Sequence, residues 1–131
     1  MRLTHVRLLV DDFERTVGFY RDVLGFEVVV DASEIRYVEF AAGDAVLALY
    51  ERSMMARVVA AQDVAGRGGA IITLDDEDVD GTYARLVQAG ARPVAHPHDQ
   101  PTWGFRIALI SDPEGNLIEI NHAIEPGRVS E

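Results

Sequence analysis

Residues 111–121, SDPEGNLIEIN, combine a tight turn with a short strand that holds one carboxylate. Asp112, Pro113 and Gly115 stand at the first, second and fourth positions that a type I turn favours. The strand that follows is apolar except for Glu119. A carboxylate among branched apolar residues is costly unless it is paired, protonated or bound to a metal. The stretch therefore predicts a turn and strand in which Glu119 has either a structural partner or a function.

The composition indicates an acidic chain without cysteine. It has 131 residues and a formal net charge of −10. This length favours one compact domain, or two small half-domains that share a core. We expect no disulfide, membrane span or signal peptide, and hence a cytoplasmic protein. The charge disfavours nucleic acid and anionic membranes as partners and favours cations or cationic ligands; simple solubility explains it equally well.

One pattern of elements occurs twice along the chain. A strand over 3–10 leads into a helix that begins at Asp11, its predicted N-cap, and ends near Leu24 before Gly25. Three strand-like runs follow. The second half repeats this order with a strand AIITLDD (70–76), a helix over 78–89 that stops at Gly90, and three further strands. Superposing the two strand ends gives an offset of 64 residues.

The repeat predicts an α+β fold of two paired βαβββ modules that form a curved, barrel-like sheet around a cavity. We place module one at about 1–51, a linker at about 52–67, module two at about 68–125 and a short tail at 126–131, all within one domain. In each module the helix covers one face of the sheet. The bare faces must then pair, within one chain or across a dimer, and such interfaces are common binding sites.

A His in the first strand, the run FYRDVLGFEV (19–28) and the run DPEGNLIEI (112–120) resemble the vicinal oxygen chelate superfamily. That superfamily includes glyoxalase I, extradiol dioxygenases, fosfomycin-resistance enzymes and bleomycin-resistance proteins. The resemblance covers essentially the whole chain and implies a homodimer, with or without exchange of modules. It specifies the fold more closely than the activity, because the fold hosts several chemistries.

The resemblance also implies where metal ligands would stand, at the first and last strands of each module. His5 and Glu119 occupy two of these positions, whereas the repeat places Ala48 and Gly69 at the other two. Neither Ala48 nor any residue of 68–70 can ligate a metal through its side chain. A catalytic zinc or iron normally has at least three protein ligands. We therefore expect no metal cofactor, with Zn, Ni, Fe or Mn as the alternative.

Other side chains complete such a site poorly. Strand alternation puts Glu51 on the wrong face, and Glu39 is a candidate for the cavity face where the family has no ligand. His96 and His98 form an H-x-H pair, but the neighbouring prolines predict a loop, where histidines are more often exposed.

His5 and Glu119 also allow other interpretations. His5 could be a hydrogen-bonded core histidine, and Glu119 could form a buried ion pair with Arg106 or Arg7. Alternatively His5 and Glu119 could act together as an acid–base pair, because a carboxylate can fix the tautomer of an imidazole. The sequence leaves these possibilities open.

The run DQPTWG (99–104) points to binding without chemistry. It is similar to a Gln-Pro-Trp-Gly run of bleomycin-resistance proteins, with Thr102 inserted. In that branch an acidic dimer binds a flat cationic antibiotic without a metal of its own. Trp103, the only tryptophan, could stack on such a ligand or simply plug the rim of the barrel.

We therefore interpret the chain as a metal-independent small-molecule-binding protein that sequesters or senses a cationic or aromatic compound, rather than as an enzyme. The alternative is a divalent-metal-dependent lyase, isomerase or dioxygenase-like enzyme that uses His5, Glu119 and an atypical third ligand. The candidate ligand-binding residues are Trp103, Tyr50, Ala48, Arg106 and Asn121. Met54 and Met55, in the linker, could adapt to a ligand or belong to an interface.

Overall fold

The computed structural model describes residues 4–65 and 71–125. The chain divides into two compact units, residues 1–68 and 69–131, and each is described by itself. None of the described helices is long and apolar enough to cross a membrane.

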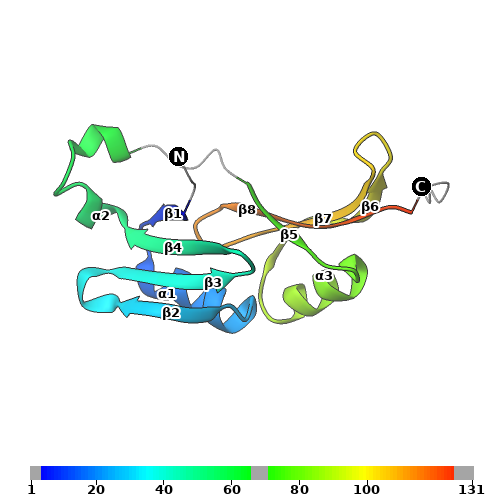
Figure 1. The fold of residues 1–131 in the computed structure, drawn as a ribbon, viewed down its shortest axis with the longest axis horizontal. Coiled ribbons are helices and arrows are strands. Elements are labelled where there is room, and N and C mark those ends of the chain that lie inside the picture. The colour runs from blue at the N-terminus through cyan, green and yellow to red at the C-terminus, as the bar shows by residue number, and fades with distance from the viewer. Residues whose placement is uncertain (1–3, 66–70, 126–131) are drawn as a thin grey trace. The chain divides into compact units, whose positions relative to one another are not determined.

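The first unit is a four-stranded sheet with strand order β1-β4-β3-β2 (Figure 1). Its elements are β1 (His5–Val10), α1 (Phe13–Gly18), a π-helical turn (Phe19–Val23), β2 (Glu27–Ala32), a 3-10 turn (Ser33–Ile35), β3 (Tyr37–Ala42), β4 (Ala45–Glu51), α2 (Arg52–Met55) and a second 3-10 turn (Ala61–Val64). β1 and β4 run parallel, and the other neighbours are antiparallel.

The second unit repeats this plan with strand order β5-β8-β7-β6. Its elements are β5 (Ile71–Asp75), α3 (Val79–Gln88), β6 (Arg92–Gln100), β7 (Phe105–Ser111) and β8 (Leu117–Ala123). β5 and β8 are the parallel pair. The predicted α+β class and the two βαβββ modules are confirmed.

The turn before β8 has the predicted form. The Gly115 N–H donates to the carbonyl of Asp112 at 3.0 Å, and Gly115 has a φ of 84°, which favours glycine. The Asp112 side chain is buried and accepts the N–H groups of Glu114 and Asn116 at 2.9 and 2.8 Å. Asp112 thus fixes the start of β8 and, with it, the position of Glu119.

The helix starts differ slightly from the prediction. The N-cap of α1 is Asp12 and not Asp11: its side chain accepts the Arg15 N–H. The N-cap of α3 is Asp78, which accepts the Gly81 N–H at 3.0 Å. Gly25 and Gly90 follow the helices at positive φ, as their role as stops predicts.

The strand register corrects the repeat offset. Arg7 pairs with Ala48 in the first unit, and Thr73 pairs with Glu119 in the second. With Ala48 and Glu119 equivalent, the first strands are offset by 66 residues and not 64, and His5 corresponds to Ile71. The earlier candidate, Gly69, and the rest of 66–70 lie outside the described residues. Ile71 is equally unable to ligate a metal.

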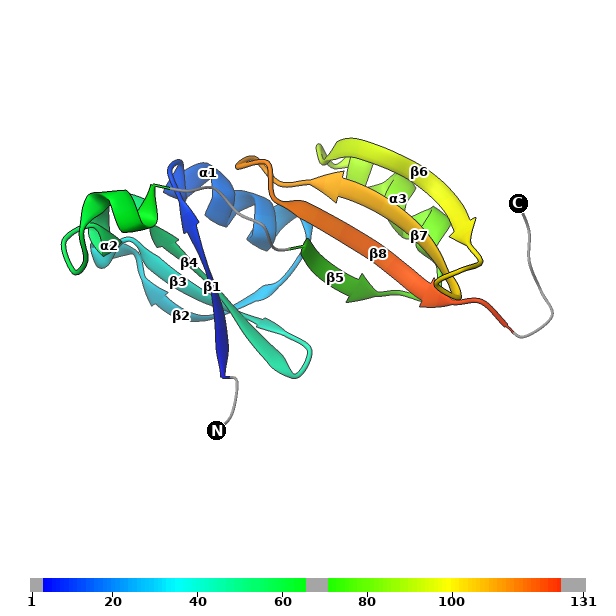
Figure 2. The same ribbon diagram turned by 90° about the horizontal axis from the view of Figure 1, so that it is seen from above.

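The helices α1 and α3 each cover one face of the sheet of their own unit (Figure 2). In the first unit Phe40 and Leu49 are fully buried; in the second, Ile118 and Ile120 are buried, as is Leu86 of α3. The opposite face of each sheet, here called the helix-free face, retains exposed apolar side chains such as Val30 and Ile71. This agrees with the expectation that a single module leaves one face of its sheet bare.

The segment around His96 and His98 was predicted to be a loop, and this prediction was wrong. Both residues lie in β6, whose pairing with β7 shifts register between Ala95 and His98. Pro97 sits within this shift. β6 is an edge strand, and a proline is tolerated at such a bulge because no ladder hydrogen bond is lost.

Candidate functional site

Polar side chains from two strands meet on the helix-free face of the first sheet. Nε2 of His5 lies 3.1 Å from Oε2 of Glu39, and the Tyr37 hydroxyl donates to the same oxygen. The Arg7 Nε–H donates to the Tyr37 hydroxyl at 3.3 Å. These four residues, here called the Glu39 cluster, form one continuous network. The Glu39 side chain is 15% exposed, so its charge is partly desolvated and needs these partners.

Strand register explains why the network forms. His5 and Arg7 are two residues apart on β1, and Tyr37 and Glu39 are two residues apart on β3. Side chains two residues apart on a strand point to the same side, so all four side chains share a face. β4 lies between these strands, and its residue between Arg7 and Glu39 is Ala48. Ala48 is fully buried. A small residue at this position leaves room for the longer side chains on both sides to approach one another.

Aromatic rings flank the cluster. The Tyr37 and Tyr50 rings are edge-on at 5.5 Å between centroids, and the Arg7 guanidinium carbon lies 5.4 Å from the centroid of Tyr37. Partial burial raises the pKa of Tyr37, and its hydrogen bond to the Glu39 carboxylate raises that pKa further. The phenol therefore stays protonated at neutral pH and donates to Glu39.

Glu119 lies on the helix-free face of the second sheet, and its described partner is its own strand neighbour. The Asn121 amide donates to Oε2 of Glu119 at 3.0 Å. Thr73 and Leu109 are its neighbours across the sheet. The suggested ion pair with Arg106 is not formed, and Arg7, the other suggested partner, belongs to the first unit. In the β7–β8 ladder Arg106 stands opposite His122. Its side chain therefore points to the helix-covered face, away from the face that carries Glu119 and Asn121.

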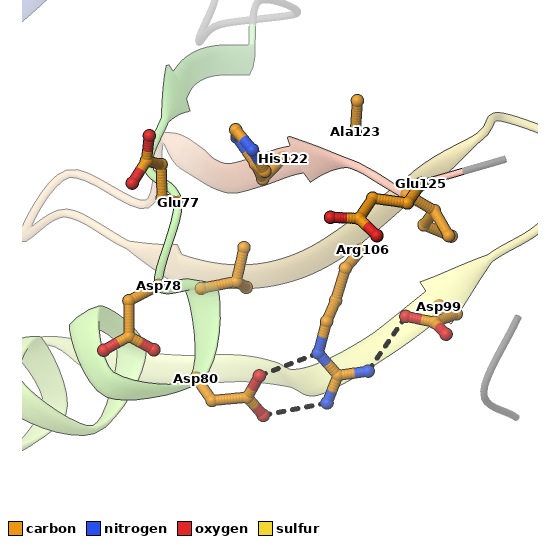
Figure 3. A pocket seen from close by; sticks show the side chains of 10 residues that line it. Glu77, Asp78, Asp80, Asp99, Arg106, His122, Ala123 and Glu125 are labelled. Carbon is orange, nitrogen blue, oxygen red and sulfur yellow. Dashed lines mark hydrogen bonds and ion pairs between the residues drawn. The ribbon is translucent and has the colours of Figure 1, made fainter. Parts of the chain in front are cut away.

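Arg106 instead lies in a pocket of about 650 Å³ in the second unit, beside the start of α3 (Figure 3). Its Nε and Nη2 donate to the two oxygens of Asp80 at 2.7 and 2.8 Å, and its Nη1 donates to Asp99 at 2.9 Å. The pocket is lined by Glu77, Asp78, Val79, Asp80, Asp99, Arg106, His122, Ala123, Ile124 and Glu125.

Charge pairing dominates this pocket. The hydrogen bonds from Arg106 lower the pKa of Asp80, and the two carboxylates raise the pKa of Arg106. Nδ1 of His122 lies 2.9 Å from an oxygen of Asp75. All three nitrogens of the guanidinium already donate to aspartates. Arg106 therefore organises the pocket rather than offering a free cation to a ligand.

The remaining predicted residues are distributed over several places. Trp103 lies in the turn between β6 and β7 and is 57% exposed. Tyr50 and Ala48 belong to the helix-free face of the first sheet, and Asn121 to that of the second. His5 is in the first unit and Glu119 in the second. The H-x-H histidines diverge: His96 packs on Tyr83 of α3, whereas His98 pairs with Ile107.

Sequence reasoning missed Arg7 and Tyr37 as site residues. The signal was present, because Arg7 stands two residues after His5 and Tyr37 two residues before Glu39. Strict alternation along both strands would have placed them on the face already assigned to His5.

Comparison with known proteins identifies the family. The model of the glyoxalase/bleomycin resistance protein/dioxygenase superfamily matches residues 2–120, and the chain belongs to that superfamily. The uncharacterized protein YraH of Bacillus subtilis is 37% identical over 124 residues, which cover 92% of this chain and 97% of YraH.

Solved structures agree with this assignment. A glyoxalase/bleomycin resistance protein/dioxygenase from Nocardioides superposes with a TM-score of 0.81 at 21% identity, covering 100% of this chain and 89% of that one; this likeness concerns the fold. TnmS3, an antibiotic binding protein from Streptomyces sp. CB03234, superposes with a TM-score of 0.72 at 26% identity, covering 94% of this chain and 96% of TnmS3.

The donor set does not fit the metal site that the family resemblance implies. Nε2 of His5 faces Glu39, and Ala48 and Ile71 stand at two further ligand positions. Among the described residues, no three His, Asp or Glu side chains form a group that could hold a metal ion. Since catalytic sites normally use at least three protein ligands, we derive no step through a metal.

Proposed function

We propose that this protein binds a small aromatic or cationic compound on the helix-free faces of its sheets, without a metal ion, and thereby sequesters or senses it. The observation that carries the proposal is the Glu39 cluster. Together with the flanking Tyr50, it presents a guanidinium, an imidazole and two tyrosine rings on a sheet face that its own helix leaves bare.

The contacts of His5 support the metal-independent part of the proposal. Nε2 is within hydrogen-bonding distance of Glu39, and Nδ1 is 2.9 Å from the Thr4 hydroxyl. Both ring nitrogens thus have protein partners. A metal ligand must keep one nitrogen lone pair free for the metal, so metal binding by His5 would first have to break a contact.

Two features support an aromatic or cationic ligand. Tyr37, Tyr50 and the exposed Trp103 offer aromatic surfaces, which stack on planar rings and attract cations. The net charge of −10 favours the approach of cations. The structural likeness to TnmS3, an antibiotic binding protein, supports small-molecule binding and is consistent with a role in antibiotic resistance.

We also propose that the protein forms a homodimer. Exposed apolar side chains such as Val30 and Ile71 on the helix-free faces favour pairing of modules, because burying apolar surface contributes about 25 cal/mol per Å². Light scattering coupled to size-exclusion chromatography tests this. A monomeric mass at micromolar concentration would contradict it.

To test the binding proposal, the protein is first treated with chelator. Cationic, neutral and anionic aromatic compounds are then titrated into it, and binding is measured from amide NMR shifts. Shifts should concentrate on the helix-free faces and near Trp103. Trp103→Ala should abolish or strongly weaken binding without unfolding the protein, because the indole is largely exposed. Ile35→Ala, an exposed apolar residue on a 3-10 turn, is the matched control. Binding that appears only when metal is restored would overturn the proposal.

A further inference from the structure

We infer that the ligand of the first sheet is a planar aromatic compound that carries a carboxylate or a comparably compact anionic group, and that Arg7 is the residue that recognises this group. The inference rests on the aromatic part of the proposed function and replaces the cationic part, because it assigns the ligand a negative group next to the ring.

Arg7 is held in place by Tyr37. Its Nε–H donates to the Tyr37 hydroxyl at 3.3 Å, and its guanidinium carbon lies 5.4 Å from the Tyr37 ring centroid. Neither Nη atom has a hydrogen-bond partner among the described residues. A guanidinium binds a carboxylate through two parallel N–H donors. The edge of Arg7 that carries Nη1 and Nη2 is therefore oriented and available for such a pair.

Arg106 of the second unit gives a useful contrast. All three guanidinium nitrogens of Arg106 donate to Asp80 and Asp99. Arg7 has no carboxylate partner among the described residues, although the chain carries 22 acidic residues against 12 basic ones. In so acidic a protein, an arginine that is positioned by a tyrosine instead of an aspartate or glutamate favours a role in binding an anion.

Two carboxylates share this face with Arg7, and neither is paired with it. Glu39 is the nearest carboxylate in the register, and it already faces His5 and the Tyr37 hydroxyl. Glu27 shares the face but stands on the edge strand β2, opposite Ala41. More distant carboxylates are weakly felt, because the screening length at physiological salt is about 8 Å.

The aromatic part of the ligand follows from Tyr37 and Tyr50. Their rings are edge-on at 5.5 Å, an arrangement that a third ring can extend by stacking or by a T-shaped contact. Tyr37 carries both functions, since it packs on Tyr50 and holds the guanidinium. A ring on the tyrosines would place its substituent beside Arg7.

The test compares three probes that share a ring and differ in charge: benzoate, benzyl alcohol and benzamidinium. Dissociation constants are measured by amide NMR titration of the full chain in a buffer that contains a chelator. We expect benzoate to bind at least about tenfold more tightly than benzyl alcohol, as charge-assisted pairs exceed neutral ones. Arg7→Gln should abolish this preference, and Arg7→Lys should retain only part of it.

Two further variants separate recognition from net charge and folding. Arg21→Gln removes the same charge from the π-helical turn, where Arg21 pairs with Asp22, and should leave the preference intact. Tyr37→Phe keeps the ring but loses the hydroxyl that holds Nε, and should reduce the preference. Arg7 is exposed, so its substitution should not unfold the protein. If Arg7→Gln nevertheless unfolds, Arg7→Lys and Tyr37→Phe still test whether the preference for benzoate depends on the guanidinium.

The outcomes separate this inference from the proposed function. Tighter binding of benzamidinium than of benzoate at this face would overturn the inference and leave small-molecule binding standing. Equal loss of benzoate affinity in Arg7→Gln and Arg21→Gln would overturn the assignment of Arg7. Absence of any shift on the helix-free faces with all three probes would overturn both.

Discussion

Nε2 of His5 lies 3.1 Å from Oε2 of Glu39, and that oxygen also accepts the Tyr37 hydroxyl. A carboxylate from β3 thus occupies the side of the imidazole that would otherwise face a ligand or a metal. This contact joins His5 and Glu39, both of which the sequence suggested for the cavity face, to Tyr37, which it did not suggest. It also contributes to the raised pKa of Tyr37, which measurements in solution can detect.

Tyr37 should make the stability of the protein depend on alkaline pH. Burial and Glu39 raise its pKa in the folded state above the value of about 10 for an exposed tyrosine. Its contribution to the free energy of unfolding is therefore complete below about pH 10 and is lost as the pH rises through the folded pKa. Urea unfolding from pH 8 to 11 should show a shallower loss of stability in Tyr37→Phe.

Glu39→Gln should also reduce this alkaline slope, because the carboxylate contributes to the raised pKa of Tyr37. Glu27→Gln removes a carboxylate from the same face without touching the cluster and should leave the slope unchanged. Identical slopes in wild type and Tyr37→Phe would contradict the assignment of a raised pKa to Tyr37.

Arg106 should be more important for stability than its exposed partner, Asp80. The Asp99 side chain is 5% exposed, so Arg106→Met removes a charged donor from a buried acceptor and should cost about 2 kcal/mol. Asp80→Asn, at a more exposed partner, should cost less than about 1 kcal/mol. Equilibrium urea unfolding at pH 7 gives both values. Equal costs would contradict this ranking.

The same pair predicts an acid dependence. Arg106 lowers the pKa of Asp80, so the stabilising contribution of Asp80 is present above the unfolded pKa of about 4 and is lost as the pH falls through the folded pKa. Arg106→Met should lose stability less steeply between pH 5 and pH 2 than the wild type. A steeper loss in the variant would show that the pairing is wrong.

The sequence predicted the two modules because their signals are local. Helical spacing, the stops at Gly25 and Gly90 and the Asp112 turn depend on neighbours within a few residues. The partner of Arg106 depends on which face of β7 it occupies, and the run FRIALIS is apolar on both faces, so the sequence left that face open. The offset of the repeat was misjudged because it was anchored on the acidic pairs 11–12 and 75–76, whereas the equivalent N-caps, Asp12 and Asp78, are 66 residues apart, as the strands are.

The Glu39 cluster shows what a linear pattern cannot supply. Each module was expected to use the first and last strands for its site, so β3 received little weight. The cluster forms because β4 carries the small Ala48 between Arg7 and Glu39. Such a contact across three strands depends on register, which the sequence alone leaves open.

Gly81 and Asp78 should be energetically coupled. A Cβ added at Gly81 would lie 2.1 Å from Oδ2 of Asp78, the N-cap of α3. Alanine normally exceeds glycine in a helix by about 1 kcal/mol, and loss of an aspartate cap costs about 1 kcal/mol. Gly81→Ala should therefore be close to neutral in the wild type and stabilising by about 1 kcal/mol in Asp78→Ala. A double-mutant cycle measures this coupling, and simple additivity would contradict it.

Glu119 gives the decisive test of metal dependence. In the structure its oxygen accepts from Asn121, and an amide oxygen can replace it, so Glu119→Gln should fold normally. Elemental analysis of protein purified without chelator should find less than one metal ion per chain, and titration with nickel, zinc, iron or manganese should give the same weak response in wild type and Glu119→Gln. His98→Ala is the matched control for the H-x-H pair. One tightly bound ion per chain that disappears in Glu119→Gln but persists in His98→Ala would instead establish the metal-dependent alternative with Glu119 as a ligand.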